Sequence, residues 1–184
     1  MKSKESRAIK SMSSTPTRGT TSTATSPRAS IAIVGAGPRG ISIIERIAAY
    51  LGRSGAAVGD SAQLTIHLID DAQHGAGRIW DTEQTHTLCM NTLAGAVTLF
   101  TEPGSTVGAP VLEGPIQYEW IQLLRGEREG IDKPKQELFD AFPPHPSIAK
   151  EFAAEIAATV PESNPSRALY GAYLRWALEG ALAQ

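Results

Sequence analysis

The chain has 184 residues and a formal net charge of -2, with 41% hydrophobic and 20% charged residues. These values are typical of a globular protein, and the lack of a basic excess argues against a protein that binds nucleic acid. Cys89 is the single cysteine, which excludes an internal disulfide and a multi-cysteine metal site and fits a reducing, cytoplasmic setting. No apolar run approaches the roughly 20 residues of a membrane helix.

Residues 1–29 are rich in Ser, Thr, Lys and Arg and lack the aliphatic residues that a core needs. We therefore expect a disordered basic tail. The segment has no apolar stretch of the kind found in secretory signals, and an organellar transit peptide is the alternative interpretation. The ordered domain is expected to span residues 30–184.

The first ordered elements are predicted to be a strand, a helix and a second strand. Residues 31–35 form a short apolar run, residues 38–51 carry aliphatic side chains at helical spacing, and residues 64–70 form a second apolar run. Residues 52–62 are a Gly, Ser and Ala-rich loop. A strand, crossover helix and strand build a parallel pair, so the sequence predicts an α/β, Rossmann-like fold.

The rest of the chain has a weaker pattern. Residues 86–92 and 96–101 are short strands or bends, and residues 115–124 are expected to form a helix. Four prolines predict a loop over residues 126–146. Two further helices are predicted over residues 148–160 and 166–182.

The glycines of the first turn carry the main functional signal. Gly35, Gly37 and Gly40 form a G-x-G-x-x-G between the first strand and the helix. In a dinucleotide-binding turn, the first glycine permits the tight bend, the second lets the backbone approach a pyrophosphate, and the third lets the helix pack on the strand. Pro38 suits the first helical turn, and Arg39 is a candidate phosphate contact, although a solvent-facing side chain is the alternative. The N-terminus of the helix favours anions.

An acidic residue ends the second predicted strand. Asp70 follows Gly40 by 30 residues (70 − 40), longer than the usual roughly 20, and the loop over 52–62 accounts for the excess. Its carboxylate is predicted to accept hydrogen bonds from an adenosine ribose, and Asp71 is the competing candidate. An acid here also disfavours the 2′-phosphate of NADP. A structural Gly-rich turn with a surface Asp70 is the non-functional alternative.

Other residues are open to two interpretations each. Arg78 is a candidate for a charge-assisted bond to phosphate, or else a solvated surface charge. Asn91 and Thr92 are candidates for bonding flavin edges, or else they form local turns. Cys89 lies between apolar neighbours, so we expect an inert buried thiol. The histidines lack metal-ligand spacing, so no metal site is predicted and no catalytic residue is identified.

Three short segments resemble a known family. Pro38-Arg39-Gly40, Gly75-Ala-Gly-Arg-Ile-Trp80 and Met90-Asn91-Thr92 are similar to the bacterial FAD/NAD(P)-binding protein family, whose members resemble flavin-dependent monooxygenases, including the N-hydroxylating ones. The resemblance implies FAD in the N-terminal Rossmann unit and NAD(P)H as the source of hydride. It also implies further strands and a nicotinamide domain, and the sequence contains no second G-x-G-x-x-G.

The resemblance therefore predicts an incomplete sheet with added C-terminal helices. A partner chain or a homo-oligomer would complete it, so catalysis by this chain alone is uncertain. We expect an FAD-binding part of a flavin-dependent oxidoreductase. Two alternatives are an NAD-binding Rossmann protein without flavin, and a non-catalytic module that pairs with another chain. A dinucleotide is the expected small-molecule partner, and neither nucleic acid nor a membrane is expected.

Overall fold

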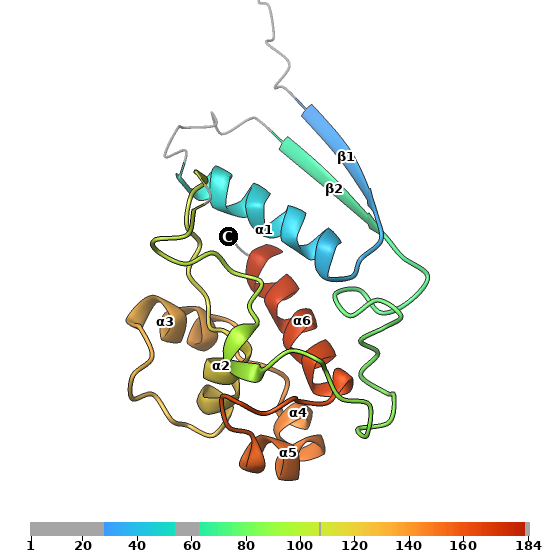
Figure 1. Cartoon of the computed structure of the whole chain (residues 1–184). Coiled ribbons are helices and arrows are strands. Elements are labelled where there is room, and N and C mark those ends of the chain that lie inside the picture. Colours follow the sequence, from blue (N-terminus) through green and yellow to red (C-terminus); the bar gives the residue numbers. More distant parts are fainter. Residues whose placement is uncertain (1–27, 54–62, 107, 183–184) are drawn as a thin grey trace, which may run out of the picture.

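A small parallel sheet and a cluster of helices make up the molecule (Figure 1). The computed structural model describes residues 28–53, 63–106 and 108–182. Strand β1 (Arg28–Val34), helix α1 (Pro38–Arg53) and strand β2 (Gln63–Ile69) follow one another, and β1 pairs with β2 in parallel. This arrangement is the predicted strand, crossover helix and strand, which is the core of a Rossmann-like fold.

The alternation of side chains explains how the sheet packs. Ile33 is paired in register with Leu68, and both belong to the same apolar cluster as Ile41 and Ile44 of α1. The opposite face of the sheet is left open by the described residues, and Val34 on it is 83% exposed. One face of the sheet is thus covered by α1, whereas the other still presents apolar side chains.

The remaining elements form the helical half of the molecule. They are the short 3₁₀ helix η1 (Ala94–Ala96) and helices α2 (Gln117–Leu124), α3 (Lys133–Ala141), α4 (Pro146–Glu151), α5 (Ala153–Ala158) and α6 (Arg167–Leu182). Helix α6 is buried along most of its length and packs against α1, so that it joins the two halves (Figure 1). Trp120, Tyr173 and Trp176 pack edge-on or tilted against one another in the centre of the cluster.

Several predictions about the second half of the chain were wrong. Helix α3 lies within residues 126–146, where a loop was predicted from the prolines; Pro134 lies in the first turn of α3, where a missing N–H has no cost. The single helix predicted over 148–160 is divided into α4 and α5 at Phe152, a buried residue with non-helical backbone angles. Residues 86–92, predicted as a short strand or bends, contain turns, bends and one isolated bridge between Cys89 and Ser166, which agrees with the second alternative.

The domain boundary also differs slightly from the expected one. Strand β1 begins at Arg28, so the predicted boundary at residue 30 falls inside it. The rest of the predicted tail, residues 1–27, lies outside the described residues, as do residues 54–62 of the predicted loop.

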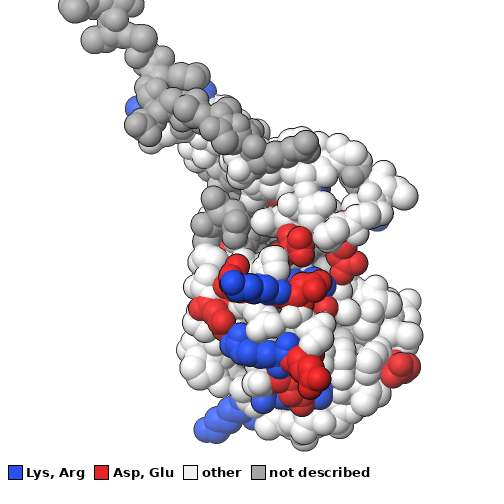
Figure 2. Space-filling view, turned by 90° about the vertical axis from the view of Figure 1, so that its left-hand side faces the viewer, with Lys and Arg blue, Asp and Glu red and all other residues white. Residues whose placement is uncertain are grey.

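The face that carries α3 is covered with charges of both signs. Figure 2 shows basic and acidic side chains interleaved there, and they include the pairs Arg128–Asp140 and Lys133–Glu137. Interleaved charges create no extended field of one sign. Among the described helices, none combines the length and the apolar character that crossing a bilayer requires.

Candidate functional site

The turn that joins β1 to α1 continues the sheet and then starts the helix. Gly35 has a φ of 101°, a backbone conformation that glycine adopts at no steric cost. Its N–H still donates to the carbonyl oxygen of Ile69 at 2.8 Å, and Ile41 then donates to Gly37 at 3.1 Å as the first helical bond. We call residues 35–40 the phosphate turn.

The second and third glycines of the phosphate turn have different surroundings. A Cβ atom at Gly40 would lie 2.1 Å from the carbonyl oxygen of Gly35, so only glycine allows α1 to start this close to β1. A Cβ atom at Gly37 would meet nothing within 4 Å. The close packing therefore depends on Gly40, while Gly37 faces open space that a ligand can occupy.

The start of α1 offers unused hydrogen-bond donors. The N–H groups of Gly37, Arg39 and Gly40 have no backbone acceptor among the described residues, and Pro38 has no N–H to offer. They border an open hollow of about 560 Å³, whose wall includes Val34, Trp80 and the exposed Arg39. Free N–H groups and the positive end of a helix dipole make this hollow suitable for an anion.

Asp70 follows β2 and contacts the phosphate turn directly. One oxygen of its carboxylate accepts the N–H of Ala36 at 2.6 Å, and the other accepts the N–H of Ala72 at 2.8 Å. The hydrogen bond from Ala36 lowers the pKa of Asp70 most, and the hydrogen bond from Ala72 lowers it further, so the pKa lies below its usual range. A carboxylate has about four acceptor positions, so Asp70 keeps the capacity to accept from a further hydroxyl.

The other two charged candidates beside this site are paired with each other. The guanidinium of Arg78 donates to the carboxylate of Asp71, and both side chains are largely exposed. The ion pair raises the pKa of Arg78. The structure thus places Arg78 on the loop after β2, with its charge directed to Asp71.

The Gly-rich segment after β2 lies against the phosphate turn. Gly75 donates its N–H to the carbonyl oxygen of Ala36 at 2.7 Å, and a Cβ atom at Gly77 would lie 3.4 Å from the Cα atom of Gly37. Trp80 then reaches the wall of the hollow. Sequence reasoning linked this segment to the cofactor only through family resemblance, and its contact with Ala36 was not foreseen.

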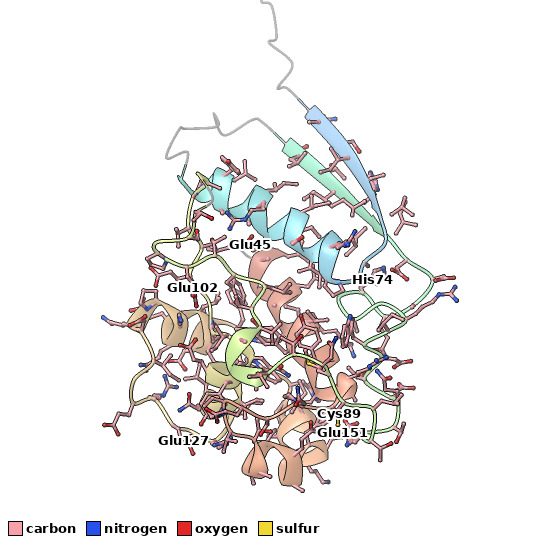
Figure 3. The ribbon with its side chains drawn as sticks, viewed as in Figure 1. Glu45, His74, Cys89, Glu102, Glu127 and Glu151 are labelled. Carbon is pink, nitrogen blue, oxygen red and sulfur yellow. The ribbon has the colours of Figure 1, made fainter. Side chains whose placement is uncertain are left out.

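Asn91 and Thr92 lie near the N-terminus of α6, whereas the phosphate turn lies beside a later part of that helix. Gly75 is packed on Arg175, whereas Cys89 is bridged to Ser166. The anchors Ser166 and Arg175 are nine positions apart (175 − 166), which is a rise of about 13.5 Å at 1.5 Å per helical residue. In Figure 3 the labelled His74 lies near the start of α1, whereas the labelled Cys89 lies beside Glu151 of α4. The structure therefore does not bring Asn91 and Thr92 to the phosphate turn itself; Thr92 donates to Asn91 at 3.5 Å.

Cys89 differs from its predicted surroundings. The thiol of Cys89 is exposed, not buried, because its segment runs over the surface beside His86 and Glu151. The guanidinium of Arg167 lies 5.8 Å from the ring centre of Trp80. In the described parts of the chain, no three His, Cys, Asp or Glu side chains are grouped as a metal site would require.

Comparison with known proteins gives a consistent assignment. The model of a family described as FAD-NAD(P)-binding matches residues 32–184. An L-aspartate N-monooxygenase (nitrosuccinate-forming) of Streptomyces davaonensis is 37% identical over 154 residues, which cover 83% of this chain and 21% of that protein. A protein of the same name from Streptomyces cremeus is 38% identical over 147 residues, or 80% of this chain and 20% of that protein.

A fungal relative gives a similar match. A nitrosuccinic acid synthase of Aspergillus oryzae is 34% identical over 148 residues, which cover 80% of this chain and 18% of that protein. The chain therefore spans about a fifth of the length of the curated relatives that it matches. The family match begins inside β1 and includes the phosphate turn, Asp70 and all the helices. This chain belongs to the FAD-NAD(P)-binding family.

Proposed function

We propose that the chain binds FAD and is part of an NAD(P)H-dependent flavin monooxygenase. The observation that carries the proposal is the phosphate turn, in which open space at Gly37 adjoins unused N–H groups at the start of α1. A pyrophosphate is the ligand that this combination fits, because it supplies negative charge and several acceptor oxygens at close range.

Each predicted site residue has a proposed place around FAD. The N–H groups of Gly37, Arg39 and Gly40 would hold the pyrophosphate, with Gly35 and Pro38 setting the shape of the turn.

The side chains around the turn have proposed roles as well. Asp70, or Asp71 next to it, would accept hydrogen bonds from the ribose hydroxyls, and the charges of Arg39 and Arg78 would neutralise phosphate. The polar side chains of Asn91 and Thr92 would bond the flavin edge. Bound FAD would supply the redox chemistry, and the protein would supply binding and orientation.

The relatives favour FAD over NAD as the occupant of the turn. Two of them are named monooxygenases, enzymes that insert an oxygen atom into a substrate. O₂ chemistry requires a cofactor such as a flavin, whereas a nicotinamide transfers hydride. NAD(P)H is therefore proposed as the co-substrate that reduces the flavin, bound outside these 184 residues because the sequence has no second G-x-G-x-x-G.

The substrate class also follows from the relatives. Both Streptomyces proteins are named for the oxidation of L-aspartate at nitrogen. We propose that the complete enzyme to which this chain contributes acts on the amino group of an acidic α-amino acid.

Calorimetric titration of the full chain with FAD, ADP and NAD in separate experiments tests the cofactor proposal. Binding of FAD and of ADP, which share the adenosine diphosphate group, is expected, with FAD bound more tightly than NAD. Binding of NAD with no binding of FAD would contradict the proposal and favour a flavin-free Rossmann protein.

The open face of the sheet supports a further proposal about assembly. Val34 is 83% exposed and Ile69 is 50% exposed, so a second polypeptide is proposed to cover them. Light scattering on the purified chain tests the case in which this polypeptide is a second copy. A mass of about twice 19.5 kDa is expected in that case, and a monomer at high concentration would contradict it.

A further inference from the structure

Ala36, between the first two glycines of the phosphate turn, is held at both of its backbone polar groups by the segment that follows β2. Its N–H donates to Asp70 at 2.6 Å, and its carbonyl oxygen accepts from the N–H of Gly75 at 2.7 Å. Ala36 is itself fully buried. We call these two hydrogen bonds the Ala36 clamp.

The bond from Gly75 determines where the N–H of Gly37 points. The described peptide bonds are trans, and in a trans peptide the C=O and the N–H of one unit point in opposite directions. The carbonyl of Ala36 is turned toward Gly75, so the N–H of Gly37, in the same peptide unit, is turned away from Gly75. That N–H has no backbone acceptor among the described residues and is left for a ligand.

The bond to Asp70 orients the preceding peptide unit by the same geometry. The N–H of Ala36 points to the carboxylate, so the carbonyl of Gly35 points the other way, toward α1. A Cβ atom at Gly40 would lie 2.1 Å from that carbonyl oxygen, which agrees with this direction. Asp70 thereby directs the carbonyl group of Gly35 toward the start of α1. The second carboxylate oxygen of Asp70 is held by the N–H of Ala72.

Helix α6 provides the fixed base of the clamp. Gly75 has a φ of 93°, and a Cβ atom there would lie 2.8 Å from the Cα atom of Arg175. A second close approach follows along the segment, since a Cβ atom at Gly171 would lie 1.8 Å from the carbonyl oxygen of Trp80. Residues 75–80 therefore rest on the main chain of α6, and α6 is one of the most buried elements of the molecule.

We propose that Asp70 and Gly75 are positioning residues that fix both peptide groups of Ala36 and so set the phosphate turn to receive a diphosphate before any ligand arrives. This inference rests on the proposed function for its ligand, and it gives Asp70 a role beyond contact with the ribose. A turn held in its binding geometry loses less conformational freedom on binding, which strengthens the affinity.

Asp70→Asn, with Asp81→Asn as the matched control, separates the clamp from a ribose contact. Asp81 also accepts the N–H of the residue two positions on, Glu83, at 2.9 Å, and it has no proposed role in binding. The amide NH₂ group cannot accept a hydrogen bond, so one of the two N–H bonds to residue 70 is lost. Titrations of the full chain with inorganic pyrophosphate and with ADP, followed by NMR, are the measurement. The clamp predicts about tenfold weaker binding of both ligands to Asp70→Asn and less than a twofold change for Asp81→Asn. Weaker binding of ADP with unchanged binding of pyrophosphate would overturn the clamp and leave a ribose contact.

Gly75→Ala, with Gly104→Ala as its control, tests the contact with α6. Both glycines have a positive φ, of 93° and 83°, but a Cβ atom at Gly104 would meet nothing within 4 Å. Both alanine variants therefore carry backbone strain, but the collision with Arg175 occurs in Gly75→Ala alone. We expect about tenfold weaker binding of pyrophosphate for Gly75→Ala only, and unchanged binding in a folded Gly75→Ala variant would overturn its role. If that variant does not fold, the Asp70→Asn comparison decides.

The ligand-free chain gives a readout that does not depend on the cofactor. The amide of Ala36 should exchange slowly with solvent, and its NMR resonance should titrate with Asp70; the titration should be lost in Asp70→Asn. Fast exchange in the unmodified chain would overturn the clamp. Slow exchange in a chain that binds neither pyrophosphate nor ADP would keep the clamp and refute the proposed function.

Discussion

A side chain at Gly40 would collide with the main chain of Gly35, because a Cβ atom there lies 2.1 Å from the Gly35 carbonyl oxygen. We predict that Gly40→Ala lowers the free energy of unfolding by about 1–3 kcal/mol, since α1 must move away from β1. Gly52→Ala, on the same helix with no atom within 4 Å, should not destabilise the chain. Thermal unfolding of both variants is the measurement, and equal stabilities would refute this account of the turn.

Helix α6 offers a second matched pair of glycines. A Cβ atom at Gly171 would lie 1.8 Å from the Trp80 carbonyl oxygen, whereas one at Gly180 would make an ordinary contact of 3.6 Å with Leu138. Gly171→Ala should therefore destabilise the chain by about 1–3 kcal/mol. Gly180→Ala should leave stability unchanged or raise it by up to about 1 kcal/mol, because alanine favours helix. Urea unfolding measures both, and a stable Gly171→Ala variant would show that residues 75–80 do not rest on α6.

The buried Lys135 depends on Glu119. Its ammonium donates to both oxygens of Glu119 at 2.9 Å, and the side chain is 7% exposed. Burial alone lowers the pKa of Lys135, but the bond to Glu119 and nearby acids outweigh it, and the pKa is raised. A raised folded pKa means that the stabilisation is complete below about pH 10, the ordinary lysine value, and is lost as pH rises through the folded pKa.

Glu119→Ala should therefore cost about 3 kcal/mol at neutral pH, because it removes the hydrogen-bonded partner of a buried cation and leaves the longer contact with Glu102 at 3.6 Å. Glu137→Ala removes the partner of Lys133 in an exposed pair and should cost less than about 0.5 kcal/mol. Chemical denaturation at pH 7 compares the two variants. A small cost for Glu119→Ala would mean that Lys135 finds another partner.

Asp70 should contribute to stability in a defined pH range. Bonds from the N–H groups of Ala36 and Ala72 lower its pKa. A lowered folded pKa gives stabilisation that is present above the unfolded value of about 4 and is lost as pH falls through the folded pKa. The loss of stability below about pH 4 should be shallower in Asp70→Asn than in the unmodified chain. Identical acid profiles would show that the carboxylate bonds contribute nothing to folding.

Cys89 should react with a thiol reagent in the folded chain. Its side chain is exposed, and it is the single cysteine of the sequence. One equivalent of thiol should be modified without denaturant, at a rate that denaturant does not raise by more than a few fold. Protection until unfolding would contradict the exposed position of Cys89.

The first third of the fold could be predicted because its signals are local. The short apolar runs in β1 and β2, the helical spacing in α1 and the three glycines at fixed intervals each depend on neighbouring residues only. The bounds of α1 were predicted to within a few residues. The Rossmann-like fold followed from these same residues, whereas the family resemblance also used residues 75–80 and 90–92.

The later elements could not be predicted in the same way, because tertiary packing decides them. A proline can end a helix or stand in its first turn, and Pro134 stands in the first turn of α3. Leu88 and Met90 suggested that Cys89 is buried, yet Met90 alone is in the core while Leu88 is 47% exposed. In the site, the acid at Asp70 was foreseeable, but its bond to Ala36 joins residues 34 apart and has no local signal.

The central claim is that the phosphate turn holds FAD, and the visible absorbance of the purified chain tests it most directly. The full chain and a Gly37→Val variant are each mixed with FAD, desalted and measured. Valine fits at residue 37 in the ligand-free protein, where a Cβ atom has no neighbour within 4 Å, but it occupies the space proposed for the pyrophosphate. The account predicts flavin bands retained by the unmodified chain and lost from the variant. Equal retention by both, or none by the folded unmodified chain, would contradict it.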